Sequence, residues 1–322
     1  MIKGFKLTKN QIVFIVILII VLLPNVMPNN YVIYIADRAW ANCIAVLGLV
    51  VLYGMTGQIN LATMSFFALG AYTAAIAQMT FQVDSVVAML LGVLMATIWG
   101  IIISIPSFKL TGPFFTISTV AFGEIVRIAF LNMVSLTNGP TGLNKIPKVT
   151  VFNHVIASDT EWYYIFFTVV VLIGIVCIRI KDSHIGRAFY AVKDDELAAS
   201  LMGVNVRLTK AIALMFSSLV AGIAGAMYAH LSGYLNPNDF AQQYSNSVLT
   251  MAVLGGGDRV IGTIIAAICV TSLPEILRFM QEYYIMVFNI IILFYLLMPW
   301  AKVGEFLRGL RFKLVKSVQR VN

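Results

Sequence analysis

The stretch "DSVVAMLLGVLMATIWGIIISI", residues 84–105, carries a single charged residue, Asp84, at its first position. A helix that crosses a bilayer needs about 20 predominantly apolar residues, because the hydrocarbon core is about 30 Å thick. This stretch is long enough for that, and it is more continuous than the short strands of a membrane barrel. It therefore predicts a helix that spans a membrane.

Apolar stretches of this kind recur along the 322 residues, of which 60% are hydrophobic and 11% are charged. A soluble core cannot absorb so much apolar surface, so the composition predicts an all-α, polytopic integral membrane protein. No linker divides the chain, and we expect one membrane domain over residues 1–322. We expect about ten membrane helices, some of them partial spans. They lie near residues 11–27, 38–54, 60–79, 84–105, 113–134, 161–180, 208–231, 245–255, 260–277 and 283–300.

The net charge of +8 could indicate a nucleic-acid partner, but the positions of the basic residues give a simpler explanation. With a cytoplasmic N-terminus, seventeen of the 22 lysines and arginines fall on the cytoplasmic side, and four, including Arg38, fall outside. Membrane proteins collect basic residues on the cytoplasmic side. We therefore expect both termini in the cytoplasm, a cytoplasmic loop at about 181–207 and a basic cytoplasmic tail over 301–322.

The sequence gives no pattern for catalysis or for a bound metal ion. The three cysteines lie inside apolar runs and the three histidines are scattered, so neither set has the spacing of metal ligands. The glycine run 255–257 lacks the Gly-Lys-Ser/Thr ending of a phosphate-binding loop. We expect no enzymatic activity, no metal site and no cofactor on this chain.

The stretch "KDDELAASLMGVN", residues 193–205, predicts a short helix inside the cytoplasmic loop. Its acidic start suits the helix dipole, and a glycine ends it. A helix this short is marginal alone, and its acidic start is unfavourable on an anionic membrane surface. We therefore favour docking into a groove of a partner protein over resting on lipid. The candidate contact residues are Asp194, Asp195, Glu196, Ala198, Ala199 and Gly203.

Small and polar residues gather in "GMTGQINLATMSFFALGAY", residues 54–72. Such residues at membrane depth indicate either close packing of helices or a broken helix beside a transport path. Both interpretations remain open at this point. The candidate residues are Gly57, Gln58, Asn60 and Ser65.

Glu124 and Arg127 lie three residues apart, on one face of an expected membrane helix. An isolated charge inside a membrane is costly, so we expect the two side chains to form an ion pair. The pair can either fix the packing of helices or line a pathway, and we favour the structural role.

Six stretches, in order, resemble segments of the permeases of branched-chain amino-acid ABC transporters of the LivM type. The resemblance covers roughly residues 40–300. The stretches are "LYGMTGQINLATMSFFALGAYTAA" (52–75), "LTGPFFTISTVAFGEIVRIAF" (110–130), "LTNGPTGLNKIP" (136–147), "GRAFYAVKDDELAASLMGVNV" (186–206), "AGIAGAMYAHLSGYLNPNDF" (221–240) and "LTMAVLGGGDRVIGTIIAAICVTSLPEIL" (249–277).

The resemblance implies an ABC importer permease fold, and the permease subunit of an ATP-driven importer of branched-chain or related amino acids in a bacterial inner membrane. It also implies a second permease of the LivH type, two cytoplasmic ATPases of the LivG and LivF type that bind the ATP, and an external substrate-binding protein. In this scheme the helix at 194–203 docks into an ATPase. A permease for urea or short amides, an ion-coupled secondary transporter and a structural membrane scaffold are the alternatives.

Overall fold

The computed structural model describes residues 24, 30–107, 110, 112–151, 154–156, 158–277, 290 and 293. The chain divides into two compact units, Met1–Ser272 and Leu273–Asn322. The described part of the second unit consists of residues 273–277 and the single residues 290 and 293. A single domain over residues 1–322 stays a prediction.

The described chain is almost entirely helical, which confirms the predicted all-α class. Two short antiparallel strand pairs lie in the loops, β1 (Leu143–Asn144) with β4 (Tyr234–Leu235) and β2 (Thr150–Val151) with β3 (His154–Val155). The helices are α2 (Asn30–Leu49), its π-helical continuation η1 (Val50–Met55), α3 (Thr63–Phe81), α4 (Ser85–Ser107), α5 (Pro113–Asn132), α6 (Val134–Thr137), η2 (Gly139–Thr141), α7 (Asp159–Asp182), α8 (His184–Asp194), α9 (Glu196–Leu201), α10 (Val206–Ser232), η3 (Pro237–Phe240), α11 (Gln242–Leu254) and α12 (Val260–Ile276).

Six of the described helices are long and apolar enough to cross a membrane, namely Tyr31–Met55, Thr63–Phe81, Ser85–Pro106, Pro113–Asn132, Asp159–Asp182 and Val206–Ser232. The helix α11 has 13 residues, which agrees with a partial span near 245–255. The first and last predicted segments, 11–27 and 283–300, lie almost wholly outside the described residues. The total of about ten helices therefore stays a prediction.

The helix α2 begins at Asn30 and not near residue 38, as the sequence suggested. In the structure Asp37 is fully buried on one side of α2, while Arg38 is exposed and lines a cavity. Arg38 thus lies within a helix that is a candidate membrane span, and its assignment to the outer side stays a prediction.

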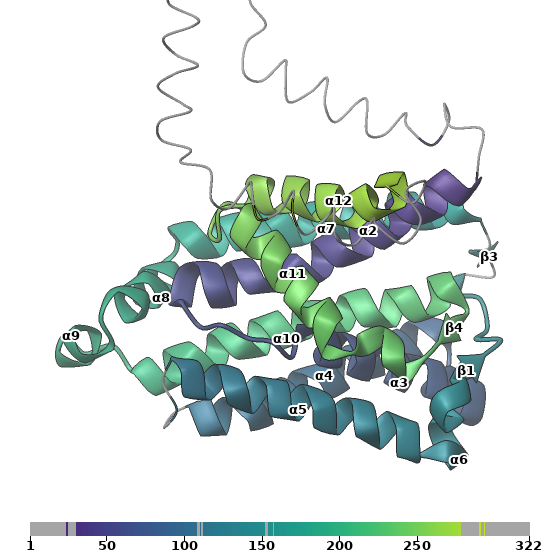
Figure 1. Cartoon of the computed structure of the whole chain (residues 1–322), viewed down its shortest axis with the longest axis horizontal. Coiled ribbons are helices and arrows are strands. Elements are labelled where there is room, and N and C mark those ends of the chain that lie inside the picture. Colours follow the sequence, from purple (N-terminus) through teal and green to yellow (C-terminus); the bar gives the residue numbers. More distant parts are fainter. Residues whose placement is uncertain are drawn as a thin grey trace, which may run out of the picture. The chain divides into compact units, whose positions relative to one another are not determined.

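The core is built around α10, which packs against α2, α3 and α4 (Figure 1). Small residues allow the backbones to approach closely. A Cβ atom on Gly225 would lie 1.9 Å from the carbonyl oxygen of Phe67, and one on Gly70 would lie 2.4 Å from the carbonyl oxygen of Gly222. In Figure 1, α9 projects at one end of these helices, whereas α6, β1 and β4 lie at the opposite end.

Candidate coupling helix and transport cavities

The short helix predicted near 194–203 is α9, and the residues that flank it cap both of its ends. The Oδ1 atom of Asp195 accepts hydrogen bonds from the backbone N–H groups of Leu197 and Ala198, at 2.8 and 3.0 Å. At the other end Gly203 has φ +86°, and the N–H of Val204 donates to the carbonyl of Ala199 at 3.0 Å. A positive φ after the last helical turn favours glycine. The predicted helix end at Gly203 is confirmed.

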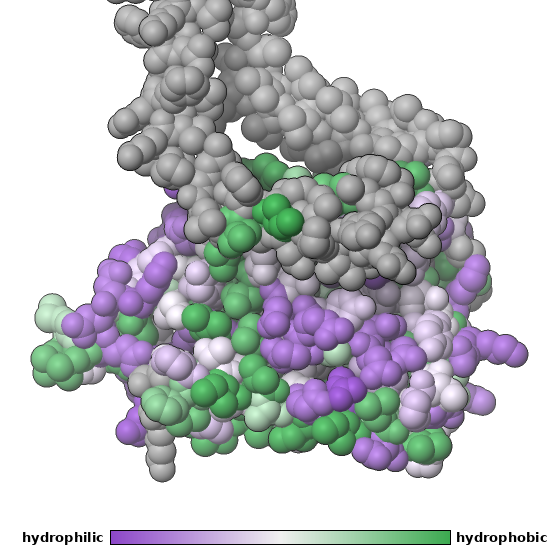
Figure 2. Space-filling view, viewed as in Figure 1, coloured by the Kyte–Doolittle hydropathy of each residue, from purple (hydrophilic) through white to green (hydrophobic). Residues whose placement is uncertain are grey.

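The exposed surface of α9 is apolar. Leu197, Leu201 and Met202 are 70%, 80% and 85% exposed, whereas Ala199 is only 4% exposed. Figure 2 shows these hydrophobic side chains at the projecting end of the molecule. Of the predicted contact residues, Ala199 therefore packs within its own chain. The sequence indicates that this helix presents an apolar strip, and these three exposed residues form it, although they are not among the six predicted contact residues.

Two lysines attach the segment α8–α9 to the membrane helices. The Nζ atom of Lys210, on α10, lies 2.5 Å from Oε1 of Glu196, and the Lys210 side chain is 6% exposed. The Nζ atom of Lys193 donates a hydrogen bond of 2.7 Å to the carbonyl oxygen of Gly54 in η1. Glu196 is thus engaged within this chain. Glu196 thus joins α9 to α10, and Lys193 joins α8 to the end of η1.

A third contact joins α7 and α8 to the turn that precedes α12. The Nζ atom of Lys181 and the hydroxyl of Tyr190 lie 2.7 and 3.1 Å from Oδ2 of Asp258. Burial by itself would raise the pKa of Asp258, but the hydrogen bonds from Lys181 and Tyr190 outweigh it and hold that pKa below its usual value. Asp258 therefore stays ionised and keeps this turn attached to α8.

A cavity of about 310 Å³, the Gly57 cavity, lies between this segment and the membrane helices. It brings together residues that the sequence placed in two separate groups, since Gly57 and Gln58 share it with Asp194, Asp195 and Glu196. The complete lining is Thr56, Gly57, Gln58, Ile59, Leu110, Gly112, Phe115, Val192, Lys193, Asp194, Asp195, Glu196 and Lys210.

Residues 57–62, between η1 and α3, are not helical and connect two candidate membrane spans. Side chains from other helices accept hydrogen bonds from the backbone here. The hydroxyl of Thr119 accepts from the N–H of Leu61, and the hydroxyl of Ser245 accepts from the N–H of Met64 at the start of α3, both at 3.1 Å. Asn60 and Ser65 are buried, and neither belongs to the lining of the Gly57 cavity.

Glu124 and Arg127 form the predicted ion pair on α5. The Nε atom of Arg127 lies 3.0 Å from Oε2 of Glu124, and Nη1 donates to Oδ1 of Asn238 at 3.0 Å. Asn238 belongs to η3, so the pair also holds η3 against α5. These contacts support a structural role for the pair.

Removing one member of this pair should be more harmful than removing both. Glu124→Gln leaves the guanidinium of Arg127 without its counter-charge, and Arg127→Gln leaves the carboxylate alone, whereas the double variant leaves no charge. Because both side chains are partly exposed, we expect a coupling of only about 1 kcal/mol. Thermal unfolding of the purified variants measures it. Additive losses would contradict the expectation.

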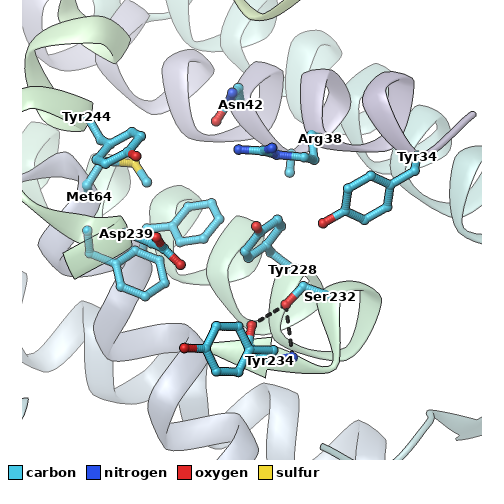
Figure 3. A pocket seen from close by; sticks show the side chains of 12 residues that line it. Tyr34, Arg38, Asn42, Met64, Tyr228, Ser232, Tyr234, Asp239 and Tyr244 are labelled. Carbon is cyan, nitrogen blue, oxygen red and sulfur yellow. Dashed lines mark hydrogen bonds between the residues drawn. The ribbon is translucent and has the colours of Figure 1, made fainter. Parts of the chain in front are cut away.

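A second cavity, the Arg38 cavity, has a volume of about 430 Å³ and lies between α2, α10, η3 and α11. Figure 3 shows Tyr34, Arg38 and Asn42 on α2 facing Tyr228 on α10 and Asp239 on η3. None of the residues that line this cavity is among the site residues predicted from the sequence. Tyr34, Arg38 and Asn42 follow one another at four-residue spacing, which puts them on one face of a helix and is the signal that could have found it. The lining is Tyr34, Arg38, Ala41, Asn42, Met64, Phe67, Tyr228, Ser232, Tyr234, Asp239, Phe240 and Tyr244.

Hydrophilic side chains extend across the middle of the face that carries η3 and α11, with hydrophobic side chains along α5 at its edge (Figure 2). The exposed polar residues there include Asn238, Asp239, Gln243 and Asn246. Polar groups are unfavourable against lipid tails. This face therefore suits contact with water or with another protein better than contact with lipid.

Comparisons with known proteins agree with this geometry. The family described as "Branched-chain amino acid transport system / permease component" matches residues 31–297. The chain is 30% identical to the high-affinity branched-chain amino acid transport system permease protein LivM of Escherichia coli (strain K12), over 92% of this chain and 75% of that protein. It is 25% identical to the corresponding permease protein LivH of Salmonella typhimurium, over 80% of this chain and 90% of that protein.

The chain is also 29% identical to the probable ABC transporter permease protein y4mJ of Sinorhizobium fredii, over 70% of this chain and 67% of that protein. No solved structure matches the chain. The family match covers most of the described helices, and those helices have the length and apolar character of a multi-pass membrane protein. The chain belongs to the permease components of branched-chain amino acid transport systems, a family of transport proteins.

Proposed function

We propose that this permease imports branched-chain or related amino acids across a bacterial inner membrane, driven by ATP that two cytoplasmic ATPase subunits bind and hydrolyse. The observation that carries the proposal is α9. Its exposed Leu197, Leu201 and Met202 form an apolar surface at the end of the membrane helices, on a helix of only six residues. Such a surface suits a partner groove, and an ATPase of the LivG or LivF type is the proposed partner.

The contacts of α9 suggest how ATPase closure would reach the transport path. A docked ATPase that moves α9 also moves Glu196 with Lys210, and Lys193 with the carbonyl of Gly54. Gly54 lies in the last turn of η1, close to Thr56 and Gly57 in the lining of the Gly57 cavity. We infer that this cavity is the cytoplasmic end of the path and that α9 opens and closes it. Asp194, Asp195, Ala198 and Gly203 are exposed and complete the proposed docking surface.

A second permease is the proposed partner for the polar face of η3 and α11. This chain is similar to both LivM and LivH, which are permease proteins of high-affinity branched-chain amino acid transport systems. That double similarity supports a pair of related permeases. Such a pair would enclose the exposed polar side chains of that face between the two subunits. An external substrate-binding protein would deliver the solute to the end that carries β1 and β4.

The proposed orientation puts both termini and α9 in the cytoplasm. We expect a cysteine at Thr141 to react with a membrane-impermeant thiol reagent in intact cells, and a cysteine at Ser200 to react only after the membrane is opened. Both positions are exposed, and the native Cys43, Cys177 and Cys269 are replaced in the background. Labelling of Ser200→Cys from outside would contradict the orientation.

The proposed function is tested by purifying the tagged chain from cells that also express the candidate ATPases, second permease and binding protein. We expect all the membrane and ATPase subunits to co-purify, and the solute-loaded binding protein to stimulate ATP hydrolysis by the complex. Recovery of the chain without any ATPase, at normal membrane abundance, would overturn the proposal.

A further inference from the structure

The Arg38 cavity contains one positive and one negative side chain that are not paired with each other. Arg38 comes from α2 and Asp239 from η3, and both are exposed toward the cavity (Figure 3). Within the described part of the chain, no ion pair joins either residue to another side chain. Burial raises the pKa of Asp239 above its usual value, and the positive charge of Arg38 opposes that shift. The two charges therefore share a space without neutralising each other by direct contact.

Arg38 has no paired carboxylate within the described residues. Arg38 lies within the candidate span Tyr31–Met55, where a guanidinium facing lipid is costly. Another arginine within a described span, Arg127, is held by Glu124 and Asn238. Among the described residues Arg38 has no such hydrogen-bond or ion-pair partner, and its side chain lines the cavity. An intramembrane charge of this kind is characteristic of a solute pathway.

The remaining lining fits an aliphatic amino acid. A guanidinium binds a carboxylate through two parallel hydrogen bonds, and Asp239 provides the counter-charge for an ammonium group. The ring of Tyr228 adds a face that attracts a cation. Phe67 and Phe240, with ring centroids 5.8 Å apart, and the thioether of Met64 offer an apolar wall for the side chain. The volume of about 430 Å³ is at the lower end of small-molecule sites.

We propose that the Arg38 cavity is a solute-binding site of the permease, in which Arg38 holds the carboxylate and Asp239 the ammonium group of a zwitterionic aliphatic amino acid. The proposal rests on the proposed function and adds a site, a ligand orientation and a reason for selectivity. Urea and short amides carry no such pair of opposite charges, so the cavity favours an amino acid over them.

The test uses the purified transporter complex in lipid nanodiscs, without the binding protein, and three matched solutes. Leucine has both charges, leucinamide lacks the carboxylate, and 4-methylpentanoate lacks the ammonium group. Calorimetric titration should show that the wild-type complex binds leucine at least about tenfold more tightly than either analogue, because each analogue leaves one charge of the cavity unpaired.

The two variants should then lose different preferences. Arg38→Gln should bind leucine and leucinamide equally, and Asp239→Asn should bind leucine and 4-methylpentanoate equally. Arg38→Lys, which keeps the charge but not the planar fork, should retain part of the preference for leucine. Lys145→Gln removes a positive charge that lines neither described cavity and should behave as wild type. Thermal unfolding without solute reports whether each variant is folded.

Unchanged leucine affinity in folded Arg38→Gln and Asp239→Asn complexes would overturn the assignment, as would a wild-type complex that does not distinguish the three solutes. ATPase recovery and ATP hydrolysis, measured on the same preparations, separate this result from the proposed function. Retained ATPase coupling with no effect of the cavity variants would reject the solute site and leave the proposed function in place. Loss of ATPase association already in the wild type would reject both.

Discussion

Replacing Leu201 with glutamine should lower the recovery of ATPase subunits with this permease at least about tenfold, while its abundance in the membrane stays unchanged. Leu201 is 80% exposed on α9, so its substitution removes no packing within the chain. Burial of a leucine side chain at an interface contributes about 1.5–3 kcal/mol, and each 1.4 kcal/mol corresponds to about a factor of ten in affinity. ATPase co-purification at matched membrane abundance is the measurement.

Val155→Gln is the matched control, because Val155 is 48% exposed on β3, at the opposite end of the helices from α9. This control should retain wild-type recovery of the ATPases. Leu201→Gln with wild-type ATPase recovery and transport would show that α9 does not dock there. A helix that rests on lipid would instead lose membrane contact without any change in the recovered ATPase.

Replacing Lys193 with methionine should separate ATPase binding from transport. The substitution keeps an aliphatic stem but removes the ammonium group that donates to the carbonyl of Gly54 at 2.7 Å. If that contact carries motion from α8 and α9 to the Gly57 cavity, transport should fall at least about tenfold per ATP hydrolysed, with ATPase recovery close to wild type. Parallel measurements of solute uptake and of ATP hydrolysis in proteoliposomes give this ratio.

Arg187→Met provides the control for Lys193→Met on the same helix. Within the described residues, the Arg187 side chain is exposed and takes part in no hydrogen bond or ion pair with the membrane helices. It should leave the ratio of uptake to hydrolysis unchanged. An unaltered ratio in Lys193→Met would rule out the Lys193–Gly54 contact as the transmitting element.

The sequence was sufficient for features that depend on local pattern. The apolar run at 84–105 became α4, and the positive φ of Gly203 ends α9 as predicted. The spacing of Glu124 and Arg127 brought the two side chains together, because residues three apart share a helix face.

Features that depend on long-range contacts were beyond the sequence. Lys193 and Gly54 are 139 positions apart, and a single sequence carries no sign that they meet. The Arg38 cavity combines residues from α2, α10 and η3, which lie far apart in the sequence. The apolar content of a segment indicates whether it spans a membrane or lies in water, but it does not show which polar face of a helix lines a transport path. For the same reason Ala199 could be placed on α9 but not on its buried side.

The most direct test of the account is leucine uptake into proteoliposomes that contain this permease with its proposed partner permease, ATPases and binding protein. The account predicts accumulation only when ATP is supplied on the ATPase side, with no accumulation when the ATPases are omitted or when Leu201→Gln prevents their docking. Uptake driven by a proton or sodium gradient without ATP and without the ATPases would contradict it, and would identify the chain as an ion-coupled transporter.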